Sequence, residues 1–110
     1  MTEPVTKASL SLSRRRLVEL MQEINFGQIE GLVIHDGEPV FEPSPHVTHE
    51  IRFEGENGPR YERRIRDFAL KSRVIRLFKE LEQLGDGKVD SLEIKQGLPF
   101  RMKVRTLAGA

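Results

Sequence analysis

The chain has 110 residues, a net charge of +1, 32% charged residues and no cysteine. Val, Ile, Leu and Phe fill 33 positions, which suffices for one packed core and exceeds the level of disordered chains. Without cysteine there is no disulfide framework, thiolate metal site or cysteine nucleophile. Because no apolar run approaches about 18 residues and no signal-like segment opens the chain, we predict one small cytoplasmic domain that contacts no membrane.

Positive charge is concentrated in the second half of the chain. Residues 1–59 carry 5 Lys/Arg and 10 Asp/Glu, whereas residues 60–110 carry 13 and 7. The basic block 60–79 contains eight of these cations and only two acidic residues. This polarity indicates either a surface for an anionic partner or two halves that neutralise each other.

The first expected element is a helix that follows a flexible N-terminal arm, residues 1–12. Ser13 is the predicted N-cap, and Leu12 is placed to pack onto Leu17. Apolar residues then recur at helical spacing as far as Ile24. We expect the helix to stop at 25–27, with Gly27 in the left-handed conformation.

Two strands joined by Asp36-Gly37 are predicted next, because this dipeptide favours a two-residue hairpin turn. The turn pairs Leu32 with Phe41 and Val33 with Val40, and Pro39 indicates a short or edge strand. A third strand follows, since the residues from 47 to 54 that face one side of a strand differ in polarity from those that face the other side. Its apolar face contains Val47, His49, Ile51 and Phe53, and its polar face contains Thr48, Glu50, Arg52 and Glu54.

A second helix is predicted up to Gly85. Its apolar positions follow spacings of four and three residues, at Leu70, Val74, Leu77, Leu81 and Leu84. The helix begins either at Asp67, which is a suitable cap, or just after Pro59. In the second case a further apolar stripe forms on its opposite side and is a candidate interface. That stripe contains Tyr61, Ile65, Phe68 and Ile75.

The chain ends in a second hairpin around Gln96-Gly97. We expect Leu92, Ile94, Phe100, Met102 and Val104 to face the core. The fold class is therefore α+β, with two helices on an antiparallel sheet of four to five strands in the order α-β-β-β-α-β-β. The compact domain covers residues 13–107, residues 108–110 are a tail, and we predict no internal repeat.

No residue pattern indicates catalysis, a cofactor or a metal. His46 and His49 are three apart on a predicted strand, so their side chains project from opposite faces. Residues 86–91 resemble a calcium loop, but Lys88 stands at a ligand position and Gly97 stands where a bidentate Glu is needed. We therefore expect a protein without enzymatic activity.

Two groups of cations are candidate sites for an anion or an acidic partner. Arg14, Arg15 and Arg16 lie in the first turn of a helix, where cations oppose the helix dipole. Arg101, Lys103 and Arg105 share the outer face of the last strand, and cross-strand pairs neutralise this row if the strand with Glu50 and Glu54 is its neighbour. The full candidate set is Arg14, Arg15, Arg16, Arg63, Arg64, Arg73, Arg76, Arg101, Lys103 and Arg105.

These features favour a small binding or assembly module that uses the sheet edge or the second face of the long helix, with a protein partner or a second copy. The alternative is a nucleic-acid-binding domain that uses Arg14–Arg16, the basic block 60–79 and the last strand. The missing aromatic residues on the outer face of that strand argue against single-stranded nucleic acid.

Overall fold

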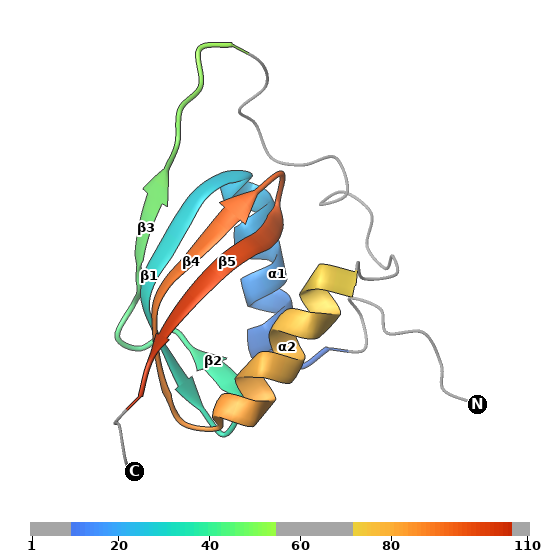
Figure 1. Ribbon diagram of the computed structural model, residues 1–110, viewed down its shortest axis with the longest axis vertical. Coiled ribbons are helices and arrows are strands. Elements are labelled where there is room, and N and C mark those ends of the chain that lie inside the picture. Colours follow the sequence, from blue (N-terminus) through green and yellow to red (C-terminus); the bar gives the residue numbers. More distant parts are fainter. Residues whose placement is uncertain (1–9, 55–71, 107–110) are drawn as a thin grey trace, which may run out of the picture.

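A computed structural model describes residues 10–54 and 72–106. The elements are α1 (Leu12–Ile24), β1 (Phe26–His35), β2 (Glu38–Val40), β3 (His46–His49), α2 (Ser72–Leu84), β4 (Gly87–Lys95) and β5 (Leu98–Arg105). The two helices lie against one face of an antiparallel sheet, and no helix or strand of residues 10–54 and 72–106 covers the other face (Figure 1). This confirms the predicted α+β class and element order. Neither described helix is long and apolar enough to cross a membrane.

The sheet has the order β2-β1-β4-β5, and β3 pairs with the part of β1 that β2 leaves open. Val33 lies opposite Val40, as predicted, and Asp36 and Gly37 have φ values of 52° and 75°. Pro39 lies in the three-residue β2, where an edge strand tolerates the missing N–H. The first hairpin therefore forms as its turn residues predict, although β2 ends at Val40, one residue before Phe41.

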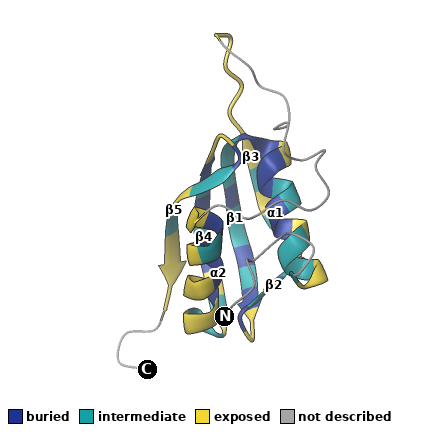
Figure 2. Ribbon diagram, turned by 90° about the vertical axis from the view of Figure 1, so that its right-hand side faces the viewer, coloured by how far each residue is buried: buried dark blue, intermediate teal, exposed yellow. Residues whose placement is uncertain are grey.

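The core lies between the helices and the inner face of the sheet (Figure 2). Buried side chains come from α1, α2 and the two central strands, including Leu17, Met21, Leu81, Leu32 and Leu92. Val74, Leu77, Phe78 and Leu81 confirm the predicted buried face of the second helix. Gly85, with a φ of 69°, follows α2 at the predicted end.

Residues 12–41 and 72–101 form the same helix–strand–turn–strand unit, displaced by 60 positions. Both helices have 13 residues. In the central strands β1 and β4, Ile29 lies opposite Leu92 and Leu32 lies opposite Val89. Val89 is the equivalent of Ile29 and Leu92 is the equivalent of Leu32, so the two cross-strand pairs are equivalent to each other. The expectation of no internal repeat is therefore wrong. Seven of the thirty aligned positions are identical: Arg16/Arg76, Leu17/Leu77, Gly27/Gly87, Leu32/Leu92, Ile34/Ile94, Gly37/Gly97 and Pro39/Pro99.

Two equivalent hydrogen bonds join the two units. The Gly37 N–H donates to the Gly85 carbonyl over 2.8 Å, and the Gly97 N–H donates to the Asn25 carbonyl over 2.9 Å. Each hairpin turn thus satisfies the carbonyl at the end of the other unit's helix. The short β2 together with β3 occupies the position that the continuous β5 occupies in the second unit.

The ends of the first helix differ from the prediction. Ser11, not Ser13, is the N-cap, and its hydroxyl accepts from the Arg14 N–H. Leu12 is therefore 79% exposed and does not pack onto Leu17, whereas Leu10 is partly buried against the core. At the other end Asn25, with a φ of 64°, is the C-cap, and Gly27 is already part of β1.

The third strand is shorter than predicted, because β1 provides no partner beyond its first residue. β3 ends at His49, which lies opposite Gly27, and the Glu50 N–H makes a last bond to the Phe26 carbonyl. Residues 50–54 continue past the end of the sheet (Figure 1). Ile51 and Phe53 are consequently 69% and 98% exposed instead of facing the core.

Several predictions fall outside the described residues. These are the start of the second helix at Pro59 or Asp67, the apolar residue Leu70, and three members of the predicted second stripe, Tyr61, Ile65 and Phe68. The fourth member, Ile75, is partly buried against the chain's own core. None of the exposed large hydrophobic residues in the described ranges lies on α2.

Candidate binding surface

β5 is an edge strand. It pairs with β4 on one side, and within residues 10–54 and 72–106 no strand lies on its other side. Ile94 lies opposite Pro99 and Glu93 lies opposite Arg101. Phe100 therefore has no partner residue on β4 and forms a bulge in β5. Phe100 and Val104 are 46% and 42% exposed, and Met102 is half-buried, so the predicted inward row is only partly correct. An edge strand has fewer neighbours to cover these side chains.

The cationic row on β5 is partly neutralised, but not by the predicted residues. Arg101 pairs with Glu93 at 2.7 Å and Arg105 with Asp90 at 3.1 Å, both from β4. β3, the strand that precedes Glu50 and Glu54, lies at the opposite edge of the sheet, so the condition for neutralisation by these two residues is not met. Lys103 lies opposite the uncharged Ser91. The row therefore retains positive charge.

A groove of about 360 Å³ runs between α2 and β5, and we call it the α2–β5 groove. Leu77 and Leu92 form its buried floor, and Phe100 and Met102 line it from β5. Arg73 and Arg76, both exposed, line it from α2 together with Glu80. The sequence named the two arginines but not the groove, because the groove depends on which strand α2 covers.

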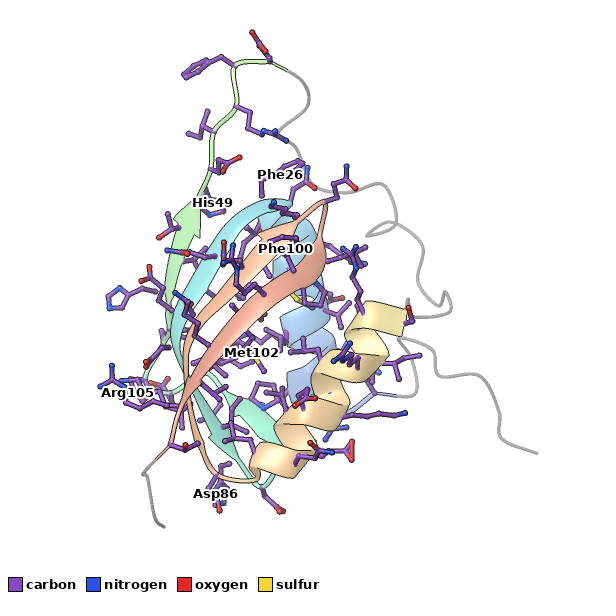
Figure 3. All side chains as sticks on the ribbon, viewed as in Figure 1. Phe26, His49, Asp86, Phe100, Met102 and Arg105 are labelled. Carbon is purple, nitrogen blue, oxygen red and sulfur yellow. The ribbon has the colours of Figure 1, made fainter. Side chains whose placement is uncertain are left out.

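Phe26 and Phe100 lie at the same end of the sheet and line a cleft of about 560 Å³ (Figure 3). The Lys95 ammonium lies 3.9 Å from the centre of the Phe100 ring, and the Arg52 guanidinium lies 4.4 Å from that of Phe26. Aromatic rings thus accompany these two cations at this end of the sheet. Glu50 and Glu93 also line the cleft, which lowers its attraction for phosphate.

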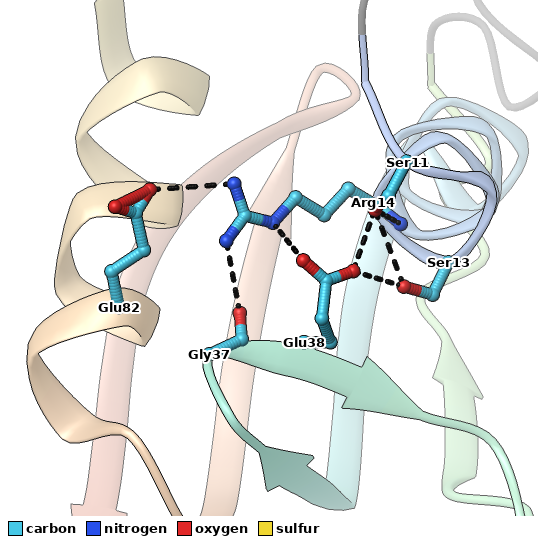
Figure 4. A network of polar contacts seen from close by, with 6 residues as sticks. All are labelled: Ser11, Ser13, Arg14, Gly37, Glu38 and Glu82. Carbon is cyan, nitrogen blue, oxygen red and sulfur yellow. Dashed lines mark hydrogen bonds and ion pairs between the residues drawn. The ribbon is translucent and has the colours of Figure 1, made fainter.

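The three consecutive arginines of α1 do not form a common site. Arg14 is directed into the molecule, with its side chain only 18% exposed (Figure 4). It pairs with Glu38 at 2.9 Å and Glu82 at 3.3 Å and donates to the Gly37 carbonyl. Arg16 instead lies over the Phe41 ring. Arg15 is half-buried and makes further contacts. The carboxylates of β2 and α2 therefore offset the unfavourable dipole position of Arg14.

Glu38 connects this network to the start of α1. Burial alone would raise its pKa, but hydrogen bonds from Ser11 and Ser13 and the charge of Arg14 outweigh burial and lower the pKa below its usual 4.5. A lowered pKa means that ionised Glu38 stabilises the fold above about pH 4.5. This contribution is lost as the pH falls through the lower folded-state pKa.

Glu38→Gln is therefore expected to reduce the free energy of unfolding by about 1 kcal/mol at pH 7, because charge-assisted hydrogen bonds are lost. The difference from the wild type should shrink below pH 4, which urea unfolding at several pH values would measure. Glu42→Gln, an exposed change just beyond β2, is the matched control. A difference that stays constant down to pH 3 would contradict the assigned role of the Glu38 charge.

The remaining candidates are dispersed or lie elsewhere. Five of the eight cations in block 60–79 are outside the described residues, and Arg63 and Arg64 are two of these five. His35 pairs with Asp86 at 2.9 Å, at the end of the sheet opposite Phe26. Within the described ranges, no three metal-ligating side chains gather into a group that could hold a metal ion.

Comparison with known proteins identifies no relative: no family model, curated protein or solved structure matches the chain.

Proposed function

We propose that this protein is a non-enzymatic cytoplasmic binding module that adds an extended, acidic segment of a protein to the free edge of β5. The observation that carries the proposal is the combination of three features on one strand. Within the described residues, no strand pairs with the outer edge of β5, and Lys103 and Arg105 form part of a cationic row on its outer face. On its inner side lies a groove with an apolar floor, whose lining also includes Arg73, Arg76, Glu80 and Arg101. Strand addition to a sheet edge uses main-chain hydrogen bonds for affinity and alternate side chains for specificity.

The pattern of the preferred segment follows from these two faces. Successive side chains of a strand point to opposite faces, so one set would meet Arg101, Lys103 and Arg105, and the other would enter the α2–β5 groove. The first set should be acidic, and the second should be apolar to cover Leu77 and Met102. The module should therefore select segments in which acidic and apolar residues alternate.

Pairing of β5 with β5 of another copy is disfavoured. In an antiparallel pair, residues on the outer face meet residues on the outer face of the partner. Arg101, Lys103 and Arg105 would thus lie against one another, and like charges directly opposite destabilise a sheet. The cationic row therefore discourages this edge-to-edge association and favours a strand of opposite charge.

The proposal predicts that a short fluorescein-labelled peptide of alternating glutamate and isoleucine binds the dilute protein, as measured by fluorescence anisotropy. Lys103→Glu should weaken binding about tenfold, because it replaces an attraction by a repulsion. Lys79→Glu, the same charge change at an exposed residue of α2 that does not line the groove, is the control. A peptide of the same composition with the acidic residues in one block should bind more weakly.

Nucleic acid is the second candidate, because Phe26 and Phe100 could stack with bases while Lys95 and Arg73 contact phosphates. Single-stranded DNA added as a competitor separates the two functions. If DNA binds at about 50 mM salt with an affinity that falls steeply at higher salt, and the peptide does not bind, the protein-binding proposal is wrong. If DNA displaces the peptide but its affinity does not fall steeply with salt, the protein-binding proposal stands.

A further inference from the structure

We propose that one segment that β5 accepts is Glu50–Glu54 of a second copy of this chain. The inference rests on the proposed function and names its partner. Residues 50–54 project beyond the sheet as a non-helical extension of β3 (Figure 1). They are exposed along their whole length, and Ile51 and Phe53 are two of the three most exposed large hydrophobic residues in the described ranges.

The segment has the alternation that β5 requires. Ile51 and Phe53 occupy alternate positions, and Glu50, Arg52 and Glu54 occupy the positions between them. When this stretch is extended, the apolar pair therefore projects to one face and the charged residues to the other. Exposed phenylalanine and isoleucine side chains gain free energy when they are removed from water.

The charges of the two strands match when Arg52 is placed opposite Lys103. In the antiparallel alignment Glu50 then faces Arg105 and Glu54 faces Arg101, so each carboxylate joins an arginine that already pairs with Asp90 or Glu93 of β4. Arg52, which pairs with Glu50 at 3.3 Å within the segment, meets Lys103 between them. In the parallel alignment Glu50 faces Arg101 and Glu54 faces Arg105, so the same kinds of charge pair form. In either direction, Ile51 and Phe53 are directed to the side of the α2–β5 groove, whose lining includes Leu77 and Met102.

The contact requires a second molecule, because β3 and β5 lie at opposite edges of the sheet. The two surfaces differ, so the contact is either exchanged reciprocally in a two-fold dimer or continued from copy to copy. One short strand buries less than the roughly 1,600 Å² of a standard interface. Reciprocal exchange doubles the contact, so we expect a dimer that dissociates on dilution.

Static light scattering on the full chain over a range of concentrations tests the assembly. The mass should rise toward twice 12.6 kDa as the concentration increases. The double variant Ile51→Ser, Phe53→Ser should remain monomeric and folded, since both side chains are already exposed. Glu50→Arg with Glu54→Arg should also dissociate the dimer, because the segment then carries only positive charge toward the cationic row.

Cross-linking tests the pairing itself, because the chain has no cysteine. Arg52→Cys and Lys103→Cys chains, made separately and mixed under oxidising conditions, should form a mixed disulfide. Arg52→Cys mixed with Lys79→Cys should not. A chain that is monomeric at all concentrations and gives no mixed disulfide overturns the inference. If the alternating peptide still binds such a chain, the proposed function stands and only the second copy is wrong as its partner; if neither binds, both proposals fail.

Discussion

Gly27→Ala is expected to destabilise the protein by about 2–3 kcal/mol, because the position has no room for a side chain. A Cβ atom at Gly27 would overlap the Thr48 carbonyl oxygen and lie 2.9 Å from the Ile24 side chain. The first of these atoms is backbone, so β3 must move away from β1 or the end of α1 must shift. Thr48 lies in β3, so the main expected consequence is loss of the β1–β3 pairing.

Gly85→Ala provides the matched control for this substitution. Gly85 has a φ of 69°, but a Cβ atom there would have no neighbour within 4 Å, so alanine costs only the left-handed backbone conformation, about 1 kcal/mol. Urea unfolding of both variants measures the difference. Equal losses would show that the approach of β3 to β1 does not restrict Gly27.

Leu32→Ala and Leu92→Ala are each expected to cost about 3 kcal/mol, since both leucines are fully buried in the shared core. They occupy equivalent positions in the two units, on the paired strands β1 and β4. Because both units contribute to one core, each variant should unfold the whole molecule in a single transition at lower denaturant. Leu12→Ala, at an exposed leucine, should change stability by less than about 0.5 kcal/mol.

Two separate transitions in Leu32→Ala, one for each unit, would contradict the single core. Circular dichroism and hydrogen exchange of α2 amides would distinguish the two outcomes, because α2 belongs to the unit that Leu32→Ala leaves intact in sequence. Loss of α2 protection together with that of α1 is the expected result.

Local signals predicted most of the fold. Asp36-Gly37 and Gln96-Gly97 determined both hairpins, since their positive φ values suit two-residue turns. The spacing of Leu77 and Leu81 identified the buried face of α2. The sequence alone shows the repeat only weakly, because most equivalent positions share burial and not identity, as Ile29 and Val89 do.

The candidate surface was less predictable, because it depends on strand order. Sequence alternation correctly placed Arg101, Lys103 and Arg105 on one strand, but it could not reveal that β4 supplies their carboxylates. The unfavourable position of Arg14 at a helix start was a real signal, yet its cause is a pair of distant carboxylates, Glu38 and Glu82. Contacts between residues that are this far apart in the sequence depend on tertiary packing, which the local sequence pattern does not determine.

Hydrogen exchange of the β5 amides gives the most direct test of strand addition. It is best measured in the Ile51→Ser, Phe53→Ser chain, where no second copy competes for the edge. Adding the alternating glutamate–isoleucine peptide should slow exchange at the β5 amide groups that do not bond to β4, and amides of β2 and β3 should be unchanged. Saturating peptide that leaves β5 exchange unaltered, or that protects the β2–β3 edge instead, would contradict the proposed binding mode.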